Sequence, residues 1–534
     1  MTSEFPSKRA RLDWRQVALP SALLLPLCIL IFARIMNFEL RRDEQLYVPP
    51  VALMRQYDLY ADIFYNHVPG SAWLFSIVAA VLNTDHLLFA SRLAVFGGWV
   101  LLGTGVMLIT LLLTRSLAVT FAMTIFVMLN DALVNQTGMA ATNNLLPLPF
   151  AYAGMGLFLL GVTGERVRPV LIAAGGLALG LAASIKVNAV GFILPIAVAA
   201  FLLPAFLPFG SRIRSVVIPL ALGGIVGASP VLFYLATDGE RFLAHIVGFH
   251  VGPHVAYWSA QAGTDPVAIS LMEKSEVAYR AWTGTANLFL IYGIVFIVLQ
   301  LIAERSSSGR MTKLFAGPVL LAAAALIISG GMSFIPTPGF PQYFAPPLIA
   351  AALLATCLYA QLDAAQRREA AFALASAALL VVVLNVPHLA PSAKNLMAVS
   401  KWTPSKVHQG GLAIARRLHD AGLEGKVATL APLYPLEGGL AVYPELGTGE
   451  FAYRAGDLMD PTLRRHFPIA SPASIGALLA ADPPAALLLG FSKDLEGPLV
   501  EFARANGYVL ADELGIKDRY GTPELYLRRP ATSP

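Results

Sequence analysis

Two adjacent carboxylates, Asp43 and Glu44, follow the first long apolar run of the sequence, residues 17–36. Arg41 and Arg42 come directly before them. Because a run of that length can span a bilayer, the acidic pair lies at a membrane face, where closely placed charges often mark function. Asp43 and Glu44 are therefore the leading candidates for chemistry at the bilayer surface. The alternative interpretation is an ordinary solvated loop charge beside two arginines.

The composition places the chain among integral membrane proteins. Of its 534 residues, 56% are hydrophobic and only 13% are charged. Its two cysteines, Cys28 and Cys357, both fall inside apolar runs, so the sequence offers neither a disulfide framework nor a cysteine metal site. The net charge of +5 comes from basic residues spread through short loops, which favours membrane orientation over nucleic-acid binding.

Apolar runs along the chain predict a polytopic α-helical membrane protein with about 11 to 13 spans. After the first run, the candidate spans are residues 93–113, 117–134, 145–162, 170–185, 190–207, 216–235, 288–302, 314–328, 343–358 and 370–384. Residues 71–82 are too short to span comfortably, and form either an interfacial helix on the outer surface or part of a hairpin. The side on which Arg92 lies depends on that choice.

Basic residues alternate between the short loops, which predicts the orientation. Lys8, Arg9, Arg11 and Arg15 precede the first span and indicate a cytoplasmic N-terminus. Every second short loop is then basic and is expected inside: Arg115; Arg166 and Arg168; Arg212 and Arg214; Arg305, Arg310 and Lys313; Arg367 and Arg368. The loops 135–144 and 329–342 carry no Lys or Arg and are expected outside.

Three longer segments then lie on the outer face. We expect a membrane-embedded domain over residues 1–388, with outer loops at 37–92 and 236–281, and a small soluble α/β domain over residues 389–534. In this last part, residues 426–430, 486–489 and 524–527 are typical of short strands, and residues 499–505 of a helix.

Several segments in this order carry a resemblance to a known family. After the basic N-terminus, the first span and Asp43-Glu44 come Asp62-Ile63-Phe64-Tyr65-Asn66-His67-Val68-Pro69-Gly70-Ser71-Ala72-Trp73-Leu74, Ser91-Arg92-Leu93, Gly180-Leu181-Ala182-Ala183-Ser184-Ile185-Lys186 and Gln342-Tyr343-Phe344-Ala345-Pro346-Pro347-Leu348. The chain resembles the GT-C class of membrane glycosyltransferases over nearly the whole membrane part. It is most similar to the branch of protein O-mannosyltransferases, the lipid A aminoarabinose transferase and the lipopolysaccharide galacturonosyltransferases.

The resemblance implies a GT-C fold and an inverting glycosyltransferase. Its donor would be a polyprenyl-phosphate sugar and its acceptor a hydroxyl of a glycolipid, polysaccharide or protein, at the outer face of the plasma (inner) membrane. A hydroxyl is a poor nucleophile, so a carboxylate must take its proton. Asp43 is the expected base, and Glu44 would orient the acceptor or the flanking arginines.

The leaving group of such a reaction is a lipid phosphate, whose growing charge must meet cations near the headgroup plane. His67, Lys186 and Arg55 are the candidates for this contact. Lys186 could instead be a helix-end lysine that snorkels to the interface, and Arg55 a solubilising residue. His67 stands where relatives often have Lys, and a neutral imidazole donates a hydrogen bond without a full charge.

The next outer loop also departs from the relatives, which commonly have an acidic residue there. This chain has Asn143 and Asn144, which can hydrogen-bond a sugar but cannot act as a base or a strong metal ligand. Their alternative role is a turn and helix N-cap. We therefore expect no metal and no other cofactor. Tyr343 is a candidate for the lipid-carrier groove, with an aromatic-belt position as its alternative.

Residues 244–258 contain His245, His250 and His254 and invite a metal interpretation. Gly252-Pro253 breaks the helix that would place two of these histidines on one face, so we expect an interfacial loop with aromatics at the headgroups instead.

Two other classes of protein fit part of the pattern. A secondary transporter or lipid flippase would also have about a dozen spans, but the spans here hold few ionisable residues, Asp131 being the main exception. A membrane scaffold that displays the C-terminal domain is the third interpretation. The charges at the outer ends of the spans and the appended outer domain count against the transporter or flippase.

Overall fold

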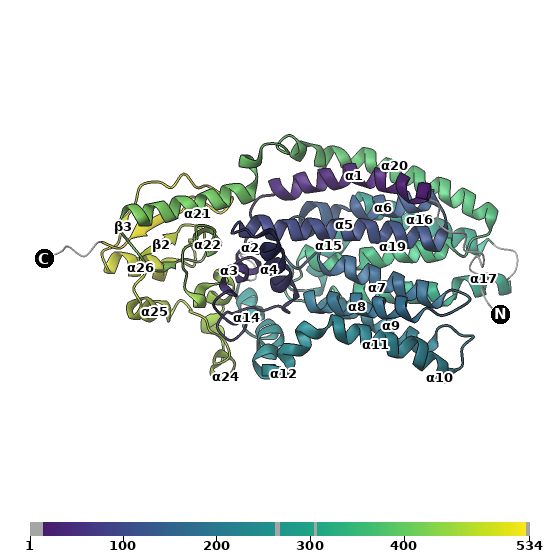
Figure 1. The fold of residues 1–534 in the computed structure, drawn as a ribbon, viewed down its shortest axis with the longest axis horizontal. Coiled ribbons are helices and arrows are strands. Elements are labelled where there is room, and N and C mark those ends of the chain that lie inside the picture. The colour runs from purple at the N-terminus through teal and green to yellow at the C-terminus, as the bar shows by residue number, and fades with distance from the viewer. Residues whose placement is uncertain (1–13, 262–266, 304–306, 530–534) are drawn as a thin grey trace.

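The computed structural model describes residues 14–261, 267–303 and 307–529. A bundle of long helices forms one part, and a smaller region with a sheet lies at one end of it, beyond short helices such as α2 and α3 (Figure 1). The basic residues Lys8, Arg9, Arg11 and Arg305, used above for orientation, lie outside the described residues.

Twelve helices make up most of the described bundle. They are α1 (Trp14–Asn37), α5 (Leu87–Thr114), α6 (Leu117–Met128), α7 (Pro147–Val162), α8 (Pro169–Ile185), α9 (Val190–Leu202), α11 (Ile218–Gly227), α12 (Ser229–Leu243), α16 (Thr285–Ile302), α18 (Gly317–Met332), α19 (Pro346–Tyr359) and α20 (Ala364–Ala393). Several begin with proline in the first turn, where its missing N–H would have no intrahelical partner anyway.

The lengths of these helices bear on the predicted spans. Within the described residues, six segments are long and apolar enough to cross a bilayer: Pro20–Asn37, Leu87–Thr114, Phe209–Gly227, Thr285–Ile302, Pro341–Tyr359 and Ala364–Ala393. Six further apolar helices are shorter, with 10–17 residues each. The fold is thus mostly helical and apolar as predicted, while the total of 11 to 13 spans stays a prediction.

Shorter helices gather where the bundle meets the C-terminal region or join its long helices. They are α2 (Glu44–Tyr47), α3 (Pro50–Leu53), α4 (Gly70–Leu82), α10 (Phe209–Arg212), α13 (Phe249–Val251), α14 (Pro253–Ala260), α15 (Leu271–Trp282) and α17 (Ser307–Leu314). Helix α4 stays at one end of the bundle. Gly70 packs against the backbone of Ser184 at the end of α8 so closely that a Cβ has no room. At its other end, Asn83 ends α4 in the left-handed conformation just before α5.

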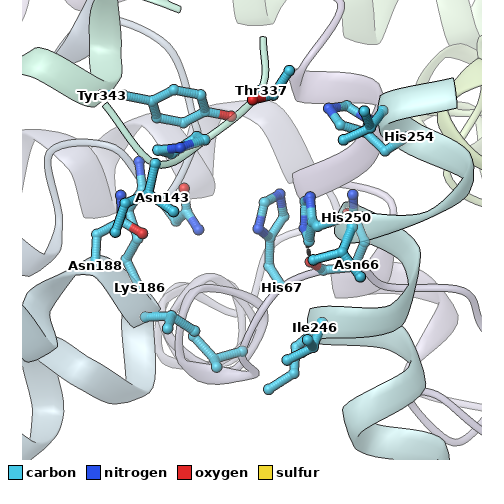
Figure 2. Close-up of a pocket in the computed structure, with 17 residues that line it drawn as sticks. Asn66, His67, Asn143, Lys186, Asn188, Ile246, His250, His254, Thr337 and Tyr343 are labelled. Atoms are coloured by element: carbon cyan, nitrogen blue, oxygen red, sulfur yellow. Dashed lines mark hydrogen bonds between the residues drawn. The ribbon is translucent and has the colours of Figure 1, made fainter. Parts of the chain in front are cut away.

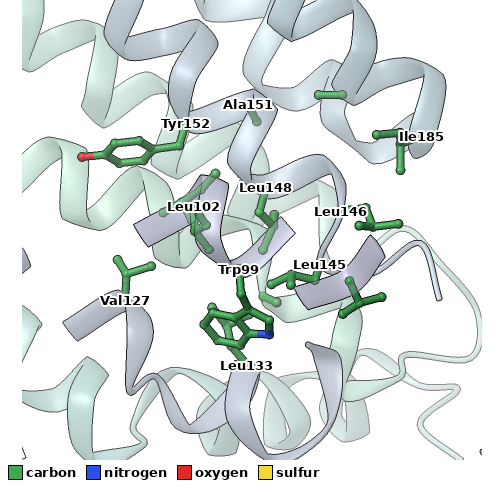
Figure 3. Packing of buried hydrophobic residues seen from close by; sticks show 14 of the residues in the cluster. Trp99, Leu102, Val127, Leu133, Leu145, Leu146, Leu148, Ala151, Tyr152 and Ile185 are labelled. Atoms are coloured by element: carbon green, nitrogen blue, oxygen red, sulfur yellow. The ribbon is translucent and has the colours of Figure 1, made fainter. Parts of the chain in front are cut away.

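A buried core beneath this end of the bundle fixes the loop between η1 (Leu133–Thr137) and α7. The Trp99 side chain is fully buried, and its Nε1 donates to the Gly138 carbonyl at 2.8 Å. Leu145, Leu146 and Leu148 pack in the same cluster (Figure 3). Because apolar side chains anchor both ends of this loop, Asn143 and Asn144 are held in fixed positions.

The C-terminal region combines a small sheet with helices. Its strands are β1 (Val427–Ala428), β2 (Ala486–Leu489), β3 (Val509–Leu510) and β4 (Glu524–Leu527), in the order β1-β2-β4-β3. β1 pairs with β2 in parallel, and β4 lies antiparallel to β2 and β3, with Ala486 opposite Leu527. The helices are α21 (Thr403–Asp420), α22 (Leu433–Glu437), α23 (Glu450–Tyr453), α24 (Pro461–Arg464), α25 (Ile475–Ala481) and α26 (Gly497–Ala505). Strands β2 and β4 have the predicted bounds 486–489 and 524–527, and α26 includes the predicted helix at 499–505. Of the predicted strand at 426–430, only Val427–Ala428 is a strand.

Hydrogen bonds tie this region directly to the loop after α1. The Leu433 N–H donates to Gln45 Oε1 at 2.9 Å, and the Tyr520 hydroxyl accepts from the Arg42 N–H at 2.7 Å. The Leu88 N–H at the start of α5 donates to Glu437 Oε1 at 2.7 Å. The C-terminal region therefore covers the end of the bundle at which Asp43 lies.

Candidate active site

Asp43 lies in the turn that joins α1 to α2 and is half-buried. Within the described residues, its carboxylate forms no hydrogen bond or ion pair. Burial raises the pKa of Asp43 above its usual range, and the nearby Arg454 cation opposes this shift. A carboxylate whose lone pairs are unused and whose pKa is raised has the properties of a general base.

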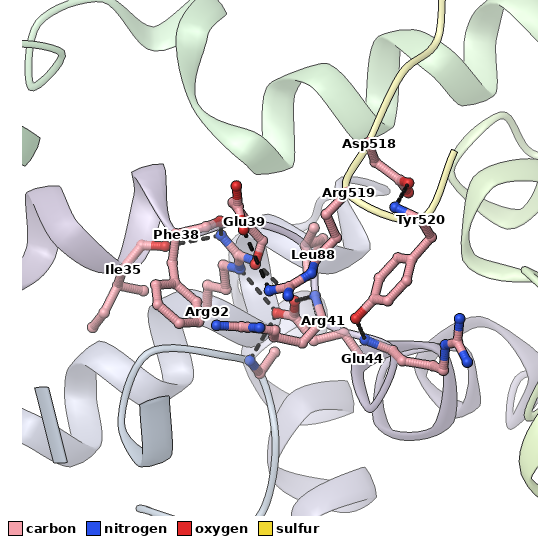
Figure 4. A network of polar contacts seen from close by, with 12 residues as sticks. Ile35, Phe38, Glu39, Arg41, Glu44, Leu88, Arg92, Asp518, Arg519 and Tyr520 are labelled. Atoms are coloured by element: carbon pink, nitrogen blue, oxygen red, sulfur yellow. Dashed lines mark hydrogen bonds and ion pairs between the residues drawn. The ribbon is translucent and has the colours of Figure 1, made fainter. Parts of the chain in front are cut away.

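Glu44, by contrast, is fully buried and lies in a polar network with Arg41 and Arg92 (Figure 4). Its carboxylate accepts from Arg92 Nε and Nη2, each at 2.9 Å, and from the backbone N–H groups of Arg41 and Ala141 at 2.9 and 2.8 Å. Arg92 also donates to the Ile35 and Phe38 carbonyls at the end of α1. The position of Glu44 does not support the predicted contact with an acceptor, because its lone pairs are used in joining α1, α5 and the loop before α7.

Lys186 comes directly after α8 and is buried, with an extended backbone that ends the helix. Its Nζ donates to Asn144 Oδ1 at 2.6 Å and lies 5.1 Å from the centre of the Tyr343 ring. Burial lowers the pKa of Lys186 to about 7, while the Asp43 carboxylate acts in the opposite direction. These contacts of Lys186 point into the protein. A lysine that snorkels would instead point to the membrane interface.

His67 belongs to a hydrogen-bonded chain with Tyr47 and Asn143. The Tyr47 hydroxyl lies 2.7 Å from His67 Nε2 and 2.9 Å from Asn143 Oδ1, to which it donates. Since the hydroxyl has one proton, His67 Nε2 is then the donor to Tyr47. Burial lowers the pKa of His67 well below its usual range, so the ring is neutral and offers a hydrogen bond rather than a charge.

Three adjoining cavities bring these residues together. A cavity of about 440 Å³ lies among His67, Lys186, His250, His254 and Tyr343, with Lys186 and Tyr343 on one wall and the two other histidines opposite (Figure 2). A second cavity of about 240 Å³ shares those residues and Asn143 with the first, and adds Asp43, Asn144, Gln136, Trp258, Arg42 and Arg454. A third, of about 140 Å³, continues past Asp43 to Arg41, Thr142 and Tyr520. Asp43 is the one carboxylate among the described residues that line the three.

Arg55 lies elsewhere. It pairs with Asp85 at 2.9 Å on the surface, and both side chains are more than half exposed. The cavity beside it is a separate one, lined also by His408 and Glu437. This position does not support the predicted phosphate contact, because an exposed residue in the turn after α3 does not reach the cavity that holds Lys186.

Residues 244–258, which include α13 and most of α14, enclose one side of the site. The helix breaks at Gly252 as the sequence indicates, yet the rings of His250 and His254 remain 5.4 Å apart. His250 Nε2 lies 2.7 Å from the Asn66 carbonyl, and the His245 ring points away, to the Tyr65 N–H and the His466 carbonyl. Asp131 is not part of the cavity, and its carboxylate accepts from the Ala286 N–H and from Asn385 Nδ2.

Among known proteins, solved structures resemble this chain, and they identify its fold. No family model matches the sequence, and no curated protein matches it. Structures of ArnT from Cupriavidus metallidurans, bound to undecaprenyl phosphate and in the apo state, both align with 14% sequence identity and a TM-score of 0.57. Each alignment covers 96% of this chain and 99% of ArnT. The chain has the GT-C fold. An oligosaccharyltransferase from Archaeoglobus fulgidus also matches, at 13% identity and a TM-score of 0.47, over 95% of this chain and 74% of its own.

Within this GT-C fold, six of the eight predicted site residues line the joined cavities: Asp43, His67, Asn143, Asn144, Lys186 and Tyr343. Sequence reasoning missed Arg454, which comes from the C-terminal region and lies in the same cavity as Asp43. It also missed Tyr47, which joins His67 to Asn143. No local motif marks Arg454, because tertiary packing alone brings it to the bundle.

Proposed function

We propose that this protein is an inverting membrane glycosyltransferase that moves a hexosyl or pentosyl group from a polyprenyl-phosphate donor to a hydroxyl acceptor. The observation that carries the proposal is the Asp43 carboxylate, which has no partner among the described residues and lies in a cavity that also holds the buried Lys186 ammonium. A base and a cation in one enclosed space fit a reaction that takes a proton at one end and releases an anion at the other. The acceptor is a glycolipid, polysaccharide or protein.

The proposed reaction uses these two groups on opposite sides of the sugar. Asp43 accepts the proton of the acceptor hydroxyl as its oxygen attacks the anomeric carbon. The bond from that carbon to the phosphate oxygen breaks with its electron pair, and the polyprenyl phosphate leaves with the added negative charge. Lys186 stabilises this charge, and the amides of Asn143 and Asn144 and the Tyr343 ring hold the sugar and the lipid carrier in place.

A lipid-linked donor is supported by the apolar lining of the first cavity and by the comparison with ArnT. Its lining includes apolar side chains, among them Ile246, Val247, Val251 and Ile335, beside the polar group at Lys186. The structurally similar ArnT binds undecaprenyl phosphate in one of its structures. We place the reaction at the outer face of the plasma membrane, with a cytoplasmic N-terminus and a periplasmic or extracellular C-terminal domain, on the alternation of basic loops.

We also propose that the reaction needs no divalent metal or other cofactor. Such a metal is usually held by several carboxylate oxygens. The described residues that line the three cavities supply a single carboxylate, with the amides Asn143 and Asn144 close by. Asp43 would then act as base without a second acid.

Envelope glycans of cells test the proposal whichever sugar is transferred. Mass analysis compares cells that lack the protein with cells that regain the wild type, Asp43→Asn or the control Asp85→Asn. We expect one glycan mass difference that wild type and Asp85→Asn restore and Asp43→Asn does not. Restoration by Asp43→Asn at equal protein level would exclude the catalytic role and favour the transporter or flippase alternative.

A further inference from the structure

Arg454, at the end of α23, brings a second cation from the C-terminal region into the cavity that holds Asp43 and Lys186. Its side chain is only 6% exposed. Moving such a charge out of water is costly unless it has a partner or a ligand. The proposed reaction assigns no role to Arg454.

The surroundings of Arg454 fix the orientation of its guanidinium. The Cζ atom lies 4.9 Å from the centre of the Tyr257 ring, 4.8 Å from that of Trp258 and 4.9 Å from that of Phe451. Aromatic faces of this kind attract the plane of the guanidinium and leave its edges for hydrogen bonds.

Glu450 forms an ion pair with the guanidinium of Arg454. Its Oε1 accepts from Arg454 Nη1 at 2.9 Å and from Arg42 Nη1 at 3.2 Å, while Oε2 accepts from the Ser492 hydroxyl at 2.7 Å. A guanidinium has five N–H donors. Among the described residues, Glu450 is the one hydrogen-bond partner of Arg454, so most of its donors are left for a ligand in the cavity.

The other basic side chains of the cavity are less available to a phosphate than Arg454. Burial lowers the pKa values of His67, His250 and His254, which makes their rings neutral, and that of Lys186 to about 7. Arg42 shares Glu450 Oε1 with Arg454, but its Nη2 also donates to the Phe491 carbonyl, and its guanidinium lies over the Tyr520 ring at 4.7 Å. A phosphate that leaves with growing negative charge therefore needs a permanent cation in addition to Lys186.

We propose that Arg454 is that cation: its free guanidinium edge binds the phosphate of the polyprenyl donor together with Lys186, so that the C-terminal region completes the donor site. This inference rests on the proposed function for the nature of the donor. A planar fork of N–H groups suits two phosphate oxygens, while an ammonium contacts them as a point charge. The C-terminal region is then a working part of the site as well as its cover.

Binding of undecaprenyl phosphate to the purified full-length protein tests the proposal, with the uncharged undecaprenol as the comparison lipid. We expect Arg454→Gln to weaken binding of undecaprenyl phosphate by about tenfold or more, because a hydrogen-bonded charge is lost. Binding of undecaprenol stays unchanged. The control Arg417→Gln, at an exposed pair with Asp512, leaves both lipids unaffected.

Arg454→Lys keeps the proposal testable if Arg454→Gln does not fold. The lysine retains a charge for Glu450 but not the fork, so undecaprenyl phosphate should bind several-fold more weakly than to wild type. Wild-type binding of undecaprenyl phosphate by the folded Arg454 variants would overturn the proposal. It would also be overturned if the variants bound this lipid normally but required more acceptor, since the anion would then belong to the acceptor.

The binding experiment does not depend on turnover. Asp43→Asn should bind undecaprenyl phosphate at least as well as the wild type, because it removes only a nearby negative charge. Failure of the glycan experiment with success here would overturn glycosyl transfer and keep the phosphate site. The opposite result would keep glycosyl transfer and remove Arg454 from the donor site.

Discussion

Asp43 and Glu44 are neighbours in the chain, but the molecule gives them opposite surroundings. Arg92 and two backbone N–H groups saturate the Glu44 carboxylate in a fully buried position. The Asp43 carboxylate has no hydrogen-bonding partner in the described chain and faces a cavity with Lys186 and Arg454. A neutralised buried charge thus joins structural elements, while an uncompensated charge beside a cavity remains available for a ligand.

We expect the largest loss of stability from Glu44→Gln. The substitution leaves the Arg92 charge buried without its counter-charge, so we expect the free energy of unfolding to fall by about 3–5 kcal/mol. Unfolding in mixed detergent micelles measures the change. Glu39→Gln is the matched control in the same loop, because its ion pair with Arg519 is largely exposed and should contribute less than about 1 kcal/mol. Equal effects of the two variants would show that the Glu44–Arg92 pair is not structural.

Lys186→Met tests the proposed catalytic role of the cavity that holds Asp43. This variant removes the cation proposed to meet the leaving phosphate, and we expect turnover to fall by about a hundredfold or more. The rate of release of polyprenyl phosphate from the sugar donor in vesicles measures it. Arg55→Gln serves as the basic control, since its exposed pair with Asp85 lies outside the cavity. A Lys186→Met enzyme as active as Arg55→Gln would contradict the assigned role.

A smaller effect is expected from pH. Asp43 must be ionised to accept a proton, so turnover falls as pH drops through its raised pKa. Lys186 must be protonated to meet the phosphate, so turnover also falls as pH rises through its lowered pKa of about 7. Each limb should approach about tenfold per pH unit. In Lys186→Arg the alkaline limb should disappear, because a guanidinium stays charged. An unchanged alkaline limb in that variant would assign it to another group.

The bundle side of the candidate site could be predicted from the sequence because its signals are local. Lys186 ends an apolar run, and Asn143 and Asn144 stand in a loop between two such runs, so periodicity and charge already placed them at one face. The short strands of the C-terminal region were also visible as apolar runs between polar residues. These features depend on residues close together in the chain.

The remaining features depend on tertiary contacts that the sequence does not encode locally. Nothing near Glu44 indicates that Arg92 is its partner, and nothing near Arg454 indicates that three aromatic rings and Glu450 hold it in the cavity. Arg55 looked equivalent to Lys186 because both are basic residues near apolar runs. Only burial separates them, and burial depends on how the helices pack.

The most direct test of the account measures sugar transfer and unfolding together for Asp43→Asn and Glu44→Gln. The purified variants are assayed in vesicles with the lipid-linked donor, and their free energies of unfolding are determined under the same conditions. We expect Asp43→Asn to lose about 10²- to 10⁴-fold of its turnover with nearly unchanged stability. Glu44→Gln is predicted to be the destabilised variant, with turnover per folded molecule closer to wild type. Full transfer by a folded Asp43→Asn protein would contradict the proposed role of Asp43 as the general base.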